Sequence, residues 1–121
     1  MRSSTFIVAV VEDDRSMLES LEGLLGAAGY KVLVYLSGEE FLSSGRLQDV
    51  NCLITDIGLP GMDGIELLRL ARYSRADLVA IAITARQEPH LLNAALEAGA
   101  LNVFLKPLES SDLLMAIAPT R

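Results

Sequence analysis

At 121 residues, the chain is long enough for one domain with a full core and too short for two ordinary ones. Its 16 acidic residues outnumber its 10 basic ones, and the net charge of −6 argues against direct nucleic-acid binding, which needs clustered Lys and Arg. The first residues lack a signal-peptide pattern, and no apolar run approaches the roughly 20 residues of a membrane span. We therefore expect a cytoplasmic protein without membrane contact.

The apolar residues follow two alternating periods. Short continuous apolar runs, typical of strands buried on both faces, lie near residues 6–11, 31–35, 52–55, 78–83 and 102–105. Cys52, the single cysteine, falls within the third run, so we expect a buried small hydrophobe rather than a nucleophile.

Helical stretches separate these runs. The first carries a leucine-rich stripe, which a capping box beginning at Ser16 opens and Gly29 ends. A second capping box at Ser37 opens a shorter helix, and a third amphipathic helix is expected over 64–72.

Two more helices follow in the second half of the chain. Pro89 suits the first turn of the fourth, which Gly99 ends. The last begins near Ser110 and meets Pro119 after only about two turns.

This alternation predicts an α/β fold: a single doubly wound, five-stranded parallel sheet with strand order 2-1-3-4-5, flavodoxin-like, with a short last helix. In such sheets, the site lies beyond the carboxyl ends of the first and third strands. Asp13, Asp14 and Asp56 are expected there, and Lys106 follows the fifth strand at the same edge.

Three carboxylates this close would repel one another unless a cation joined them. Mg²⁺ fits, with Mn²⁺ as a substitute, because it prefers oxygen ligands and commonly uses one or two carboxylates. Asp13, Asp14 and Asp56 are the candidate ligands, and Gly58 could add a backbone carbonyl.

A carboxylate can also act as a nucleophile and form an aspartyl phosphate. Asp56 is placed for this role, and Lys106 could neutralise the transferred phosphoryl group. Pro107 restricts Lys106 to extended geometry, and Thr84, at the end of the fourth strand, could donate its hydroxyl.

Together these residues resemble the receiver domains of bacterial two-component response regulators over nearly the whole chain. The motifs that support the resemblance are Val11-Glu12-Asp13-Asp14, Asp56 with Leu59-Pro60-Gly61-Met62-Asp63-Gly64, Ile83-Thr84-Ala85, Ala98-Gly99-Ala100 and Lys106-Pro107. The segments Gly38–Leu42 and Asn51–Asp56 look most like the nitrogen-fixation regulator (FixJ-like) branch.

The resemblance implies that Asp56 is the phosphoacceptor for a sensor histidine kinase and that Asp13, Asp14 and Gly58 hold Mg²⁺. Thr84 and Lys106 would contact the phosphoryl group. It also implies that the domain is not an enzyme, since it catalyses only its own phosphotransfer and dephosphorylation.

Residues 1–121 would form one receiver domain, and the short last helix favours a piece of a longer regulator. Its expected partners, besides the kinase, are an output domain or a second receiver, bound through the surface of residues 86–118. At the position where many receivers carry a switching aromatic residue, this chain has Val103, and strand alternation points Phe104 to the opposite face.

Two other classes of protein share part of this pattern. A dehalogenase-type phosphatase would want a second acid at Gly58, and a flavodoxin-like module would want a phosphate loop in place of Glu12-Asp13-Asp14. A receiver-like interaction module that works without phosphorylation remains the alternative. Asp13 or Asp14 could also merely cap a helix, and Glu12 is interpreted as a flanking acid rather than a ligand.

Overall fold

The five apolar runs form one parallel sheet in the computed structural model, which describes residues 5–120. The strand order is β2-β1-β3-β4-β5, as predicted. The strands are β1 (Ile7–Val11), β2 (Lys31–Tyr35), β3 (Cys52–Asp56), β4 (Val79–Thr84) and β5 (Asn102–Leu105).

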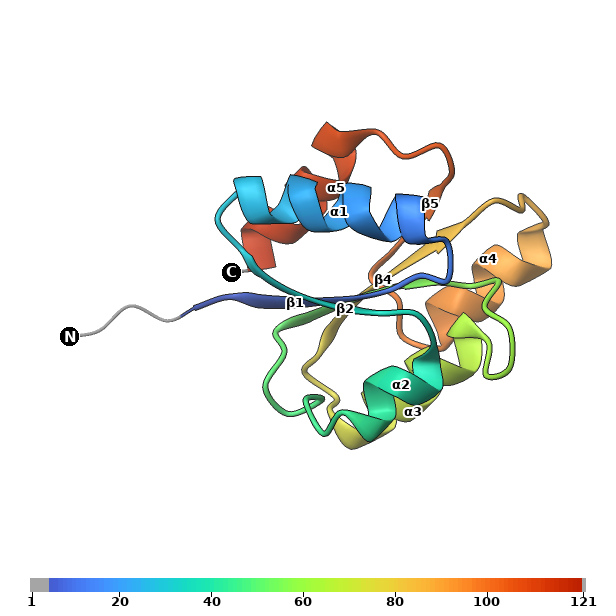
Figure 1. Cartoon of the computed structure of the whole chain (residues 1–121). Coiled ribbons are helices and arrows are strands. Elements are labelled where there is room, and N and C mark those ends of the chain that lie inside the picture. Colours follow the sequence, from blue (N-terminus) through green and yellow to red (C-terminus); the bar gives the residue numbers. More distant parts are fainter. Residues whose placement is uncertain (1–4, 121) are drawn as a thin grey trace.

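Helices cover both faces of this sheet (Figure 1). The helical elements are α1 (Arg15–Ala27), α2 (Gly38–Ser43), α3 (Gly64–Ser74), α4 (Pro89–Glu97), α5 (Ser110–Ile117) and the 3₁₀ turn η1 (Ala118–Thr120). One core lies under α1 and α5, and two others lie under α2, α3 and α4 on the opposite face. The last helix has 8 residues and is therefore short, as predicted.

The central strand β3 is buried along its whole length, because it lies between β1 and β4 with helices on both sides. Cys52 begins this strand in full burial, and desolvation raises the pKa of its thiol to about 12. The expectation of an inert, buried cysteine is confirmed.

The predicted start of the first helix is wrong. Asp14, not Ser16, is the N-cap of α1, and its carboxylate accepts the N–H of Met17 at 3.2 Å. Asp and Ser are about equally good N-caps, so propensity does not choose between them. The other capping box is correct, because the Ser37 hydroxyl accepts the N–H of Glu40 at 3.1 Å.

The two consecutive residues Val103 and Phe104 of β5 pack on opposite faces of the sheet, as predicted. Phe104 joins the core under α1 and α5, whereas Val103 packs against the core under α3 and α4. Within residues 5–120, no helix has both the length and the apolar character needed to cross a membrane.

Candidate functional site

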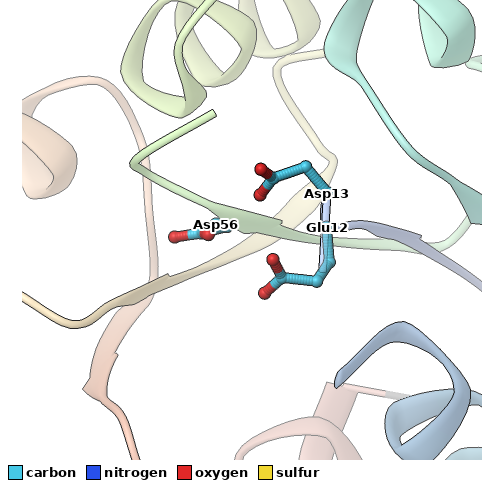
Figure 2. A group of neighbouring side chains, drawn as sticks. All are labelled: Glu12, Asp13 and Asp56. Atoms are coloured by element: carbon cyan, nitrogen blue, oxygen red, sulfur yellow. The ribbon is translucent and has the colours of Figure 1, made fainter. Parts of the chain in front are cut away.

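Three carboxylates meet at the carboxyl edge of the sheet. One carboxylate oxygen from each of Glu12, Asp13 and Asp56 lies within 4.8 Å of the others. Figure 2 shows that Glu12 and Asp13 follow the end of β1 and that Asp56 ends β3, with the carboxylates of Glu12 and Asp13 on the side of Asp56. Glu12 is only 1% exposed and Asp56 only 6%, while Asp13 is exposed.

Lys106 connects two of these acids. Its Nζ lies 3.2 Å from Asp56 Oδ2, as a hydrogen bond, and 2.9 Å from Glu12 Oε1, as an ion pair whose angles fall outside hydrogen-bond geometry. Its backbone N–H donates to the Thr84 carbonyl at 2.8 Å, which fixes the start of the side chain against β4. The lysine and the acids therefore meet at one edge of the sheet, as predicted.

The two partners of this ion pair titrate away from their ordinary ranges. Burial raises the pKa of Glu12, and the charge of Asp56 raises it further, while Lys106 and the Asp14 N–H oppose the change without cancelling it. Partial burial alone would lower the pKa of Lys106, but the ion pair with Glu12 and the charge of Asp56 outweigh it and raise that pKa. Lys106 thus stays positively charged beside Asp56.

The structure does not bring Asp14 into the acidic group. Its carboxylate caps α1, and Glu12 takes the place in the group that the sequence analysis gave to Asp14. The backbone explains this shift, because the Glu12 N–H still pairs with the Tyr35 carbonyl at 3.1 Å and prolongs the β1–β2 ladder by one residue. Glu12 therefore points inward, Asp13 forms the turn, and Asp14 begins the helix.

The loop between β3 and α3 forms one wall of the site. The Gly58 N–H donates to Asp56 Oδ1 at 3.2 Å, which orients the carboxylate. Gly64 packs directly on the strand end, since a Cβ at this position would lie 2.1 Å from the Asp56 carbonyl oxygen. Asp63 caps α3 by accepting the Glu66 N–H at 2.9 Å. This wall leaves no room for a side chain at Gly64.

The loop between β4 and α4 forms the opposite wall. Thr84 is buried, and its Oγ1 accepts the Arg86 N–H at 3.0 Å and donates to the Arg86 carbonyl at 3.3 Å. The Thr84 hydroxyl is thus turned toward this loop. A cavity of about 350 Å³ separates the two walls and is lined by Asp56, Ile57, Gly58, Asp63, Ile65, Thr84, Ala85, Arg86, Leu91 and Lys106.

This arrangement suits the transfer of an anionic group to a carboxylate. Asp56 lines the cavity, and Lys106 supplies a positive charge next to it. Thr84 lines the same cavity and carries a hydroxyl donor. Clustered carboxylate oxygens are also the donor set that a hard divalent cation prefers.

Sequence reasoning missed two functional candidates, Glu12 and Arg86. The run Glu12-Asp13-Asp14 contained the signal for the first, because Asp is a good N-cap and its use in that role moves the acidic pair back by one residue. Arg86, two residues after Thr84, was placed only in the partner-binding surface of residues 86–118, yet it also lines the cavity.

Comparisons with known proteins agree with this geometry. The family model described as response regulator receiver domain matches residues 8–118. The chain is 32% identical over 110 residues to the transcriptional regulatory protein FixJ of Azorhizobium caulinodans, covering 91% of this chain and 52% of that protein. The chain thus spans about half the length of the curated relatives it matches.

Solved structures give the same result. A CheY-like response regulator receiver domain protein of Methanospirillum hungatei superposes with a TM-score of 0.89 at 30% identity, covering 96% of this chain and 93% of that one. The structure named FixJ-N superposes with a TM-score of 0.85 at 30% identity, covering 98% and 94%.

Proposed function

The chain belongs to the response regulator receiver family, and we propose that its Asp56 accepts a phosphoryl group from a sensor histidine kinase. Receiver domains are signalling domains rather than enzymes, so the phosphoryl group serves as a signal. The observation that carries the proposal is the Asp56 carboxylate, which borders the cavity and lies 3.2 Å from the Lys106 ammonium.

The side chains suggest how the transfer proceeds. An Asp56 oxygen attacks phosphorus, a new O–P bond forms, and the N–P bond to the donor imidazole breaks with its electron pair left on the imidazole. Lys106 neutralises negative charge on the phosphoryl oxygens during this step. Thr84 donates its hydroxyl to one of them once it releases the Arg86 carbonyl.

The acidic group fits a divalent cation, because it offers carboxylate oxygens from three residues within 4.8 Å of one another. Glu12, Asp13 and Asp56 would hold Mg²⁺, or Mn²⁺ in its place, together with the Gly58 carbonyl. When bound, the metal neutralises charge on the acids and the incoming phosphoryl group. Asp14 is left out of this proposed ligand set because its carboxylate caps α1.

The partners follow from the family. We infer that the domain of residues 1–121 receives its phosphoryl group from the kinase in the cytoplasm and loses it through its own hydrolysis. Its output is a second receiver or an output domain that binds the surface of residues 86–118. The excess of acidic residues argues against nucleic-acid contact by this domain, so if DNA is the final target, another domain would contact it.

Labelling with a small phosphodonor tests the acceptor. Wild type, incubated with acetyl phosphate and Mg²⁺, should gain the mass of one phosphate, and Asp56→Asn should gain none. Asp63→Asn is the matched control, because Asp63 lines the same cavity but serves as the N-cap of α3, where Asn is tolerated. Equal labelling of Asp56→Asn and wild type would overturn the assignment.

The alternative is an interaction module that signals without phosphorylation. It gives no reason for a lysine to bridge two acids beside an open cavity, so the geometry does not favour it.

A further inference from the structure

Arg86 brings a second cation to the cavity beside Asp56. Lys106 lies against the strand ends, whereas Arg86 belongs to the loop that leads into α4. The Arg86 side chain is 66% exposed, so its guanidinium is free to rotate without unpacking the core. The cavity therefore has one half-buried cation, Lys106, and one movable cation, Arg86.

The guanidinium of Arg86 is bound to an acid of its own loop. Its Nε donates to Glu88 Oε1 at 3.2 Å, and its second terminal nitrogen contacts Glu88 Oε2, so the pair is bidentate. These bonds lower the pKa of Glu88 and hold its carboxylate ionised. Glu88 is thus the present anionic partner of Arg86.

Glu88 occupies the N-cap position of α4, where a side chain could cap the helix. Its side chain makes no capping hydrogen bond, however, and is paired with Arg86 instead. The following helix is weakly anchored, because Ala95 is its only fully buried residue among those described. A change in the Arg86–Glu88 pair would therefore act directly on the first turn of α4.

We propose that Arg86 is a phosphoryl-contacting residue that exchanges its partner, leaving Glu88 for the phosphoryl group on Asp56. The inference rests on the proposed function of Asp56. A phosphoryl group carries about two negative charges and three acceptor oxygens, which the planar guanidinium binds better than it binds a single exposed carboxylate. The exchange frees Glu88 and couples the phosphorylation of Asp56 to the start of α4.

The backbone of Arg86 makes this exchange cooperative with Thr84. The Arg86 N–H and carbonyl occupy both hydrogen-bonding functions of the Thr84 hydroxyl. A shift of the Arg86 backbone toward the cavity would carry the guanidinium with it and release the Thr84 hydroxyl toward the phosphoryl oxygens. One residue thereby controls both ligands on this wall.

Binding of beryllofluoride, a mimic of the phosphoryl group, in the presence of Mg²⁺ tests the proposal. Calorimetric titration should show about fivefold weaker binding to Arg86→Ala than to wild type, because one charge-assisted contact is lost. Glu88→Gln should bind about twofold more tightly, because the competing carboxylate is gone. Arg86→Lys keeps the charge and should restore part of the affinity.

The double variant separates competition from a structural effect. In the Arg86→Ala background, Glu88→Gln should have no effect on the affinity, since there is no guanidinium left to compete for. Opposite signs for the two single variants are not expected if the pair only stabilises the loop. Unchanged affinity in Arg86→Ala, or weaker binding in Glu88→Gln, would overturn the proposal.

Two outcomes distinguish this inference from the proposed function. If wild type and Arg86→Ala bind beryllofluoride equally and Asp56→Asn does not bind it, Arg86 is not a ligand while Asp56 remains the acceptor. If wild type itself does not bind, the assignment of Asp56 fails and the partner exchange fails with it.

Discussion

The two walls of the Asp56 cavity are held in different ways. On the β3–α3 side, the backbone packs so closely that only glycine fits at position 64, and α3 buries five of its residues. Glu39 of α2 stabilises the β3–α3 loop from outside, because its carboxylate accepts the Met62 N–H at 3.0 Å, a hydrogen bond that we call the brace. On the β4–α4 side, the contacts are an exposed ion pair and the hydrogen bonds of Thr84, and Ala95 alone of the α4 residues is fully buried.

The difference separates two tasks within one cavity. The acceptor carboxylate must keep its position, so it belongs to the wall fixed by steric contact. A signalling domain must change the conformation of a partner-binding surface, and the free-energy cost of this change is smallest where few buried contacts are lost. Chemistry is therefore anchored on one side of the cavity and conformational change is expected on the other.

The largest effect should come from adding one methyl group to the fixed wall. Gly64→Ala would place Cβ 2.1 Å from the Asp56 carbonyl oxygen, so the strand end or α3 must move. We expect a loss of about 3 kcal/mol in the free energy of unfolding and strongly reduced labelling by acetyl phosphate. Urea denaturation measures the first and mass spectrometry the second.

Gly26→Ala is the matched control, because nothing lies within 4 Å of the added Cβ in α1. This variant should be neutral or up to about 1 kcal/mol more stable, since Ala favours the helix. Equal losses in the two variants would mean that the close approach at Gly64 does not hold the wall.

A second prediction separates the neighbouring acids Asp13 and Asp14. Mg²⁺ at 100 times its dissociation constant should stabilise wild type by about 2.7 kcal/mol, because it binds only the folded site. Asp13→Ala should lose most of this gain. Asp14→Ala should keep it and instead lose about 1 kcal/mol of stability in the absence of metal, because α1 loses its cap. Thermal unfolding with and without Mg²⁺ measures all three values.

Loss of the Mg²⁺ effect in Asp14→Ala and its retention in Asp13→Ala would reverse the assignment of the two carboxylates. The acidic group would then contain Asp14 in solution, as the sequence alone suggested.

A third prediction concerns the movable wall. The amides of α4 should exchange with solvent at least roughly tenfold faster than those of α3, because α4 has fewer buried contacts to lose on opening. Native-state hydrogen exchange, resolved by residue, measures both. Equal protection of the two helices would remove the contrast between the walls.

The smallest effect should come from the brace at Glu39. Its bond from the Met62 N–H lowers the pKa of Glu39, so the folded state favours the ionised carboxylate. The stabilisation is complete above the unfolded pKa and is lost as the pH falls through the lowered folded pKa. The stability difference between wild type and Glu39→Gln should therefore shrink as the pH falls from about 6 to about 3, the range in which an ordinary carboxyl group titrates. Urea denaturation at both ends of this range provides the comparison, and a constant difference would contradict it.

The sequence predicted most of this molecule because strong local signals agreed. All five strands followed from their apolar runs, and their order followed from the alternation of strands with helices. Three of these runs lead into Glu12, Asp56 and Lys106, which predicted that acids and a lysine meet at one edge of the sheet. The failure at Asp14 has a physical cause. The apolar run marks the end of β1 at Val11, but nothing in three consecutive acids shows which of them turns inward. The backbone bond from the Glu12 N–H to the carbonyl of Tyr35, a residue distant in sequence, decides it.

Arg86 was beyond reach for a related reason. Arg86 matters because it lines a cavity whose walls come from segments that are distant in sequence. Neither Arg86 nor its partner Glu88 belongs to a periodic sequence pattern. Local sequence patterns predict which residues follow the end of a strand, but not the conformation of the loop that they form.

The bridging position of Lys106 also sets the charge balance of the acidic group. The formal charges of Glu12, Asp13, Asp56 and Lys106 sum to −2, which a single divalent ion would balance. Phosphorylation would then replace the one charge of Asp56 with about two, so one negative charge would be left without a counterion. Arg86 carries a single positive charge at that cavity, and its arrival would restore neutrality. The uncompensated charge would thus attract Arg86, and with it the loop before α4, when Asp56 at the end of β3 is phosphorylated.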